Sequence, residues 1–213
     1  MREELDAALD ALGAEMDDLA RLLEQQPEAA WHQPTRLPGW DVTVLVAHLA
    51  RGVGRIAAYG ATPLDEPPQR DRVSYLRYDA AGMAGDVTAR AYEAAQGATP
   101  TSLLAALRDA VPEARATAVR LTPATVIPSA IAPITLVEYV PTRLLEACIH
   151  GLDLREALGA PLSPTPDALT STVATLEGLL AAPRPAALAD DVAFVEAATG
   201  RRPFDDPRFP LIA

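Results

Sequence analysis

The sequence predicts an all-α helical bundle, and three observations lead to this prediction. Hydrophobic residues make up 49% of the 213 residues, which is enough for a sizeable core. Several apolar segments of helical length are separated by turns rich in proline and glycine. The first such segment has an apolar residue every three or four positions, the period of a helix with one buried face: Leu5, Leu9, Leu12, Met16, Leu19 and Leu23.

The second helix is predicted to begin at Asp41, because aspartate is a favoured cap at helix N-termini, and to end at Gly60. Two further helical stretches are expected over 72–96 and 101–120, separated by the residues GATP. The segment TPATVIPSAIAPI contains too many prolines for a helix, so we expect a short extended piece there.

The last long helix is predicted over about 135–158. Pro141 either kinks this helix or lies in its first turn, and Gly159 is its natural stop. After a short proline-containing linker, two short helices are expected near 167–181 and 187–199, followed by an irregular tail. The sum is an all-α bundle with an appended helical tail.

The charge composition excludes several classes of function. The net charge is −11, and all 18 basic residues are arginine, so nucleic acids and anionic membranes are not expected partners. Without lysine, the chain cannot form a lysine Schiff base. The absence of a long apolar run or signal peptide, together with a single cysteine, predicts a cytoplasmic protein.

A polar stripe interrupts the apolar segment LLEACIHGLDL. Glu146, His150 and Asp153 are four and three residues apart, so they share one face of a helix. This face is either simply exposed to solvent, with Arg143 and Glu146 forming an ion pair one turn apart, or it lines a site. A carboxylate and an imidazole on adjacent turns can bind one metal ion. A third ligand from a facing helix would leave coordination positions open, as in catalytic zinc sites.

Only three histidines are present, so each can be weighed as that third ligand. His48 lies in the apolar second helix and is either such a ligand or a core histidine with its hydrogen bonds satisfied. His32 lies in the proline-rich connector and is expected at the surface. Spacing alone does not show that the second helix faces the helix carrying His150.

Two stretches, PTRLPGWDVTVLVAHLARG and EYVPTRLLEACIHGLDLREALG, resemble the mycothiol-dependent maleylpyruvate isomerase family of the DinB-like superfamily. The resemblance implies an up-down four-helix bundle over residues 1–160. The sequence of residues 161–213 predicts a short helical extension packed on that bundle. It also implies that His48, Glu146 and His150 bind a divalent metal. Zinc is the expected ion, although nickel or iron also suit such a ligand set.

The same resemblance implies roles for two more side chains. Asp153 would orient a metal-bound histidine, and Arg143 would fix the glutamate or meet an anionic ligand. The implied co-substrate is mycothiol or a similar small thiol, whose thiolate attacks a small electrophilic molecule in an isomerase or S-transferase reaction. No side chain of the protein is expected to react covalently. A homodimer is compatible with the resemblance.

Other functions remain open at this stage. In the isomerases a C-terminal α/β domain helps to close the active site, whereas residues 161–213 predict only two short helices and a tail, so the electrophile is not assigned. The alternatives are a hydrolase or lyase that uses metal-bound water, and a non-catalytic ligand-binding bundle. Cys148 lies about 200° around the helix from Glu146 and is expected to be a buried hydrophobe. Arg201 and Arg202 either meet a carboxylate or a cofactor's polar groups, or are solvated or satisfy the final carbonyls of a helix.

Overall fold

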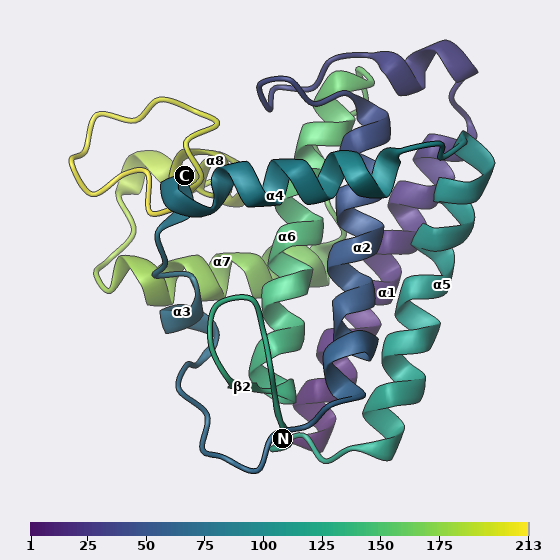
Figure 1. The fold of residues 1–213 in the computed structure, drawn as a ribbon. Helices are drawn as coiled ribbons and strands as arrows, with labels where there is room; N and C mark the ends of the chain where they lie inside the picture. Colours follow the sequence, from purple (N-terminus) through teal and green to yellow (C-terminus); the bar gives the residue numbers. More distant parts are fainter. Residues whose placement is uncertain (213) are drawn as a thin grey trace.

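The computed structural model describes residues 1–212, apart from the side chains of residues 80 and 81. Four long helices form a bundle: α1 (Arg2–Glu24), α2 (Val42–Gly60), α5 (Pro100–Arg120) and α6 (Leu136–Ala157). Both α1 and α2 pack against α5 and α6. In Figure 1 the four helices run up, down, down and up along the chain. The predicted all-α fold is confirmed.

The entrance to α2 is fixed by local sequence. The residues Leu37, Pro38, Gly39 and Trp40 form a turn in which the Trp40 amide donates to the Leu37 carbonyl over 3.0 Å. Gly39 has φ +82°, and proline followed by glycine is the pattern that a type II turn requires. Asp41 then caps the helix, because its carboxylate accepts a hydrogen bond from the backbone of the first turn, as predicted.

The connection between α2 and α5 carries α3 (Arg72–Tyr75) and α4 (Ala80–Ala95). The prediction of one helix over 72–96 is therefore wrong. The Asp79 carboxylate accepts a hydrogen bond from the amide of Gly82, which caps a new helix after a short break. Helix α4 packs on α2 and runs across the upper half of the bundle (Figure 1).

The proline-rich segment before α6 forms two short antiparallel strands, β1 (Val126–Ile127) and β2 (Ile134–Thr135), which confirms the expected extended piece. Helix α6 follows β2 directly. Pro141 lies inside this helix, beyond its first turn. Gly159, with φ +65°, ends the helix as predicted.

The chain after α6 continues with α7 (Pro166–Leu180), η2 (Ala186–Leu188) and α8 (Asp191–Ala198). Helix α7 packs on α6 and α1, and α8 packs on α7. The helix predicted over 187–199 is thus divided, because Asp190 caps α8 and separates it from η2. None of the helices in residues 1–212 is both long enough and apolar enough to cross a membrane.

A buried ion pair joins the start of α7 to the bundle. Arg155 on α6 donates to Glu15 Oε1 on α1 over 2.9 Å, and these side chains are 3% and 0% exposed. The other oxygen of Glu15 accepts from the amide and hydroxyl of Thr165, at 2.7 and 2.8 Å. Gly151 makes room for the pair, since a Cβ there would lie 2.7 Å from an Arg155 nitrogen.

Candidate metal centre

Helices α2 and α6 bring His48, Glu146 and His150 together. One potential ligand atom from each residue lies within 4.8 Å of the other two. Glu146 Oε2 is 3.5 Å from Nε2 of His48 and 3.4 Å from Nε2 of His150. Ligand atoms about 2.0–2.1 Å from a tetrahedral zinc ion are separated by about 3.3–3.4 Å, so these spacings suit such an ion.

The stripe on α6 is not a solvent-exposed face. The side chain of His150 is 14% exposed and that of Asp153 is 0% exposed. No Arg143–Glu146 ion pair is found among the described residues. The Arg143 guanidinium instead lies over the ring of Tyr139, 5.0 Å from its centroid, and 6.0 Å from that of Tyr75. The stripe therefore faces the inside of the fold.

Asp153 fixes the tautomer of His150. Its Oδ2 lies 2.9 Å from Nδ1 of His150, and an ionised carboxylate can only accept, so Nδ1 carries the proton. In the neutral ring, Nε2 then presents a lone pair toward the carboxylate of Glu146. Two lone pairs that face one another repel, so a cation is needed between them: a proton when no metal is bound, in keeping with the raised pKa of His150, or a metal ion that replaces this proton. The donor set therefore fits a divalent metal bound by nitrogen and oxygen.

The pKa values of the three side chains reflect their mutual contacts. Burial alone would raise the pKa of Glu146, but the facing rings of His150 and His48 hold it well below its ordinary value. Burial lowers the pKa of His48 more than Glu146 raises it. Burial also opposes protonation of His150, yet its carboxylate neighbours Asp153 and Glu146 raise its pKa to about 8. The site thus keeps its carboxylate ionised.

Trp40 covers one side of His48, with ring centroids 5.1 Å apart and planes tilted by 60°. The turn that precedes α2 places this indole, so the LPGW sequence acts directly on the site. The remaining histidine, His32, lies in η1 (Glu28–His32) with its side chain 72% exposed, as expected for a surface residue.

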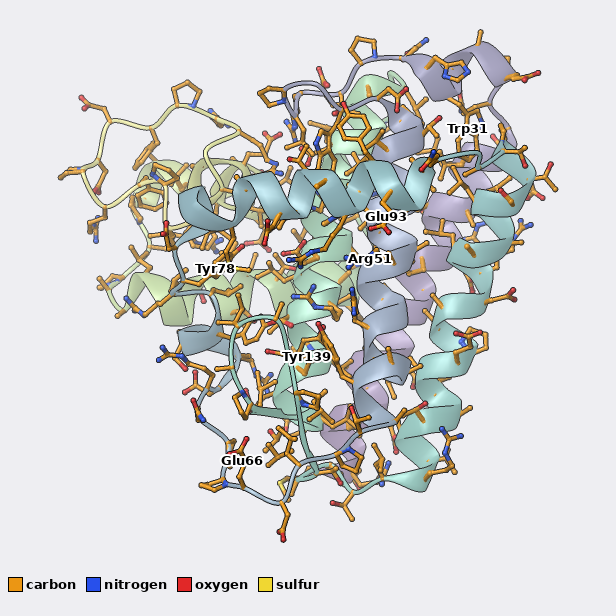
Figure 2. All side chains as sticks on the ribbon, in the orientation of Figure 1. Trp31, Arg51, Glu66, Tyr78, Glu93 and Tyr139 are labelled. Atoms are coloured by element: carbon orange, nitrogen blue, oxygen red, sulfur yellow. The ribbon has the colours of Figure 1, made fainter. Side chains whose placement is uncertain are left out.

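A cavity of about 510 Å³ opens beside the three residues and is covered on one side by α4. In Figure 2 the labelled Arg51 and Tyr78 lie on the side of the bundle that α4 crosses. Among the described residues that line the cavity, Glu146 is the one carboxylate. Five lining residues are arginines: Arg51, Arg55, Arg90, Arg143 and Arg201.

Two of these arginines pair with a carboxylate, Arg90 with Asp86 and Arg201 with Asp153. The other three, Arg51, Arg55 and Arg143, have no carboxylate partner among the described residues. Arg51 and Arg55 are one turn apart on α2. Burial and the neighbouring positive charge of Arg55 lower the pKa of Arg51. The cavity therefore concentrates positive charge in a protein whose net charge is −11.

The structure also places the remaining candidates from the sequence, Cys148, Arg201 and Arg202, and it adds one residue that the sequence analysis did not name. Cys148 is buried, and burial raises the pKa of its thiol to about 12, which agrees with a structural role. Arg202 is exposed, whereas Arg201 meets a carboxylate, that of Asp153. Sequence reasoning missed Arg36, whose Nε donates to Asp153 over 2.6 Å. The sequence signal for Arg36 is its position in PTRLPGW, one of the stretches that carry the family resemblance.

Comparison with known proteins gives one match. The family model described as the mycothiol maleylpyruvate isomerase N-terminal domain matches residues 12–155, which include both stretches that meet at the site. The searches of curated proteins and of solved structures returned no match.

Proposed function

Because this chain belongs to the mycothiol maleylpyruvate isomerase N-terminal domain family, we propose that it is a metal-dependent enzyme that uses a small thiol. The thiol is mycothiol or a chemically similar molecule, and it reacts with a small electrophile. The observation that carries this proposal is the convergence of His48, Glu146 and His150 at the wall of a cavity. Zinc is the metal we propose, with nickel or iron as ions that the same donors accept.

A divalent metal held by these three side chains would act as a Lewis acid and keep a bound thiol in its thiolate form at neutral pH. The protein's own residues prepare the site for this. Asp153 keeps the Nδ1 proton of His150 in place, which leaves Nε2 free for the metal. Trp40 packs against His48 and limits the access of water from that side.

The proposed reaction begins when the thiolate sulfur forms a bond to an electrophilic carbon. In an isomerase, addition to a conjugated cis double bond allows rotation, after which the carbon–sulfur bond breaks and the thiol is recovered. In an S-transferase, the carbon–sulfur bond remains, and a leaving group departs or a proton adds to the neighbouring carbon. Neither route changes the net oxidation state of the reactants, so neither needs an oxidant or a reductant. The cavity walls orient the two reactants.

The charge of the cavity favours an electrophile that carries an anionic group. Arg51, Arg55 and Arg143 line the cavity and have no carboxylate partner among the described residues. A guanidinium binds a carboxylate through two parallel hydrogen bonds, so these side chains suit an organic acid. Apolar lining residues such as Met83, Val87 and Ile131 would contact the rest of the molecule.

The test compares turnover with and without thiol. The zinc-loaded protein is incubated with mycothiol and either maleylpyruvate, to detect isomerisation, or monochlorobimane, to detect S-transfer. We expect turnover that requires both thiol and metal and that is lost in His150→Ala. A metal-dependent hydrolase would consume its substrate as fast without thiol, and a non-catalytic bundle would bind ligands without turnover. Metal-dependent, thiol-independent turnover would therefore overturn the proposal.

A further inference from the structure

The buried carboxylate of Asp153 is held by more than its histidine. Arg201 donates from Nε to Oδ1 over 2.8 Å and from Nη2 to Oδ2 over 2.7 Å. Arg36 donates from Nε to Oδ1 over 2.6 Å, and Oδ2 also contacts Nδ1 of His150. Each oxygen therefore has two partners, and rotation of the carboxylate would break several hydrogen bonds at once.

The arginines beside Asp153 have an electrostatic role. The side chain of Asp153 is 0% exposed, and a buried carboxylate without a cationic partner strongly destabilises a fold. His150 does not supply that positive charge when its ring is neutral, as a metal ligand must be. Arg36 and Arg201, whose side chains are 20% and 15% exposed, supply it instead.

The turn at the end of α8 places Arg201 beside Asp153. Helix α8 ends in a glycine turn in which Gly200, with φ +70°, donates to the Ala197 carbonyl and Arg201 donates to the Glu196 carbonyl, at 3.2 and 2.8 Å. These two hydrogen bonds define a Schellman motif, which directs the residue after glycine back across the helix end. The tail then returns, and the amide of Leu211 donates to the Ala198 carbonyl.

Arg36 reaches the same carboxylate from the opposite end of the chain. It directly precedes the turn that leads into α2, and its Nη1 donates to Glu196 of α8 over 2.7 Å. Arg36 thus ties the entrance of α2, which carries His48, to α8 and to Asp153. The two arginines come from segments that are adjacent in space and distant in sequence.

We propose that Arg201 and Arg36 are positioning residues of the metal centre, which act by locking Asp153 and, through it, the ring of His150. This inference rests on the proposed metal-dependent function. The segment after α8 would then contribute a residue to the metal centre, although Arg201 lies outside the residues 12–155 that match the family model. Side chains that orient a metal ligand in this way contribute about 10- to 100-fold to metal affinity.

The experiment measures metal binding directly. Arg201→Gln and Arg36→Gln are titrated with zinc in competition with a chromophoric chelator, and their cobalt(II) complexes are examined by absorption spectroscopy. We expect zinc affinity to fall about 10- to 100-fold and the cobalt bands to shift. Arg201→Lys, which retains the positive charge but has a single donor nitrogen, should recover part of the affinity. The matched control is Arg202→Gln, which changes the exposed neighbouring arginine and should bind zinc like the wild type.

A double-mutant cycle separates positioning from general stability. If Arg201 acts through Asp153, Arg201→Gln should cause little further loss of zinc affinity in an Asp153→Asn background. Thermal unfolding of the metal-free variants identifies any loss of fold, and Arg36→Gln provides the same test if the tail of Arg201→Gln is displaced.

The outcomes distinguish this inference from the function on which it rests. Wild-type protein that binds no zinc would overturn both. Wild-type binding together with unchanged affinity and an unchanged cobalt spectrum in Arg201→Gln and Arg36→Gln would overturn only the role of the arginines. Fully additive losses in the cycle would also overturn it, because Arg201 would then act independently of Asp153.

Discussion

Nε2 of His48 on α2 lies 3.5 Å from Oε2 of Glu146 on α6, so two helices far apart in sequence contribute to one cluster. If this cluster binds zinc, His48→Ala removes one of three ligands. We expect a loss of zinc affinity greater than about 100-fold, more than removal of an orienting side chain causes. Elemental analysis of the purified protein and chelator competition measure this loss.

The matched control for His48 is His32→Ala, which removes an exposed histidine of the same protein. This variant should keep the zinc content of the wild type. If His48→Ala retained full stoichiometry and affinity, a different set of ligands would have to bind the metal.

The two arginines of α2 that line the cavity give a prediction about substrate binding. Arg51→Gln and Arg55→Gln remove positive charge from the cavity and leave the proposed metal ligands in place. For an anionic electrophile we expect KM to rise about 10- to 150-fold per variant, since hydrogen bonds between charged groups contribute about 1.5–3 kcal/mol. For an uncharged electrophile KM should change little. Steady-state kinetics with both kinds of electrophile measure the difference.

Arg21→Gln controls for the loss of one positive charge from the whole protein, because Arg21 is 65% exposed on α1. Its KM for the anionic electrophile should equal that of the wild type. Equal effects of Arg51→Gln on charged and uncharged substrates would contradict a charge-specific role for this arginine.

The helices that sequence analysis placed correctly are those with strong local signals. Asp41 caps α2 and Gly159 ends α6, and both act through hydrogen bonds within a few residues. The prediction of one helix over 72–96 lacks the break between α3 and α4, which Asp79 makes by capping the second helix with its side chain. Local competition between a cap and a continuing helix decides such boundaries.

The site depends on contacts between distant segments, which spacing does not reveal. The three-and-four spacing puts Glu146, His150 and Asp153 on one face but says nothing about which helix packs against that face. The resemblance supplied His48, and the structure brings this residue near the other two. Arg36 and Arg201 approach Asp153 over sequence separations of 117 and 48 residues, beyond the reach of any periodic pattern.

The buried Glu15–Arg155 pair predicts a large effect on stability. Glu15→Ala leaves the buried guanidinium of Arg155 with Asp18 as its remaining carboxylate partner. It also removes Glu15 Oε2, which accepts from both the amide and the hydroxyl of Thr165. Breaking a buried pair so that one charge has no partner costs about 3–5 kcal/mol. Because Arg155 keeps its ion pair with Asp18, the free energy of unfolding should fall by an amount near the lower end of that range. Urea unfolding measures it. Asp10→Ala breaks an exposed ion pair with Arg115 and should cost less than about 1 kcal/mol.

Two glycines allow a matched test of the packing between α1 and α6. A Cβ at Gly151 would lie 2.7 Å from Nη1 of Arg155 and 3.0 Å from Oε1 of Glu15, so Gly151→Ala should destabilise the protein. A Cβ at Gly54 in α2 would point into open space, and Gly54→Ala should stabilise by about 0.5–1 kcal/mol through helix propensity. Urea unfolding of both variants should therefore show opposite signs. Equal effects would contradict close packing at Gly151.

The ion pair between Arg72 and Glu138 predicts a pH-dependent contribution to stability. Arg72 begins α3 and donates to Glu138 Oε2 from its backbone amide and from Nε, at 2.9 and 2.8 Å. Hydrogen bonds from Arg72 hold the pKa of Glu138 below its ordinary value of 4.5. A carboxyl with a lower pKa in the folded state stabilises the protein above its unfolded-state pKa, and this contribution disappears as the pH falls through the folded-state pKa.

The free energy of unfolding of Glu138→Gln should therefore be about 1 kcal/mol lower than that of the wild type near neutral pH, and the difference should shrink below about pH 4. Urea unfolding of both proteins across this range measures it, and a difference that stayed constant or grew toward low pH would show that Glu138 contributes through packing alone.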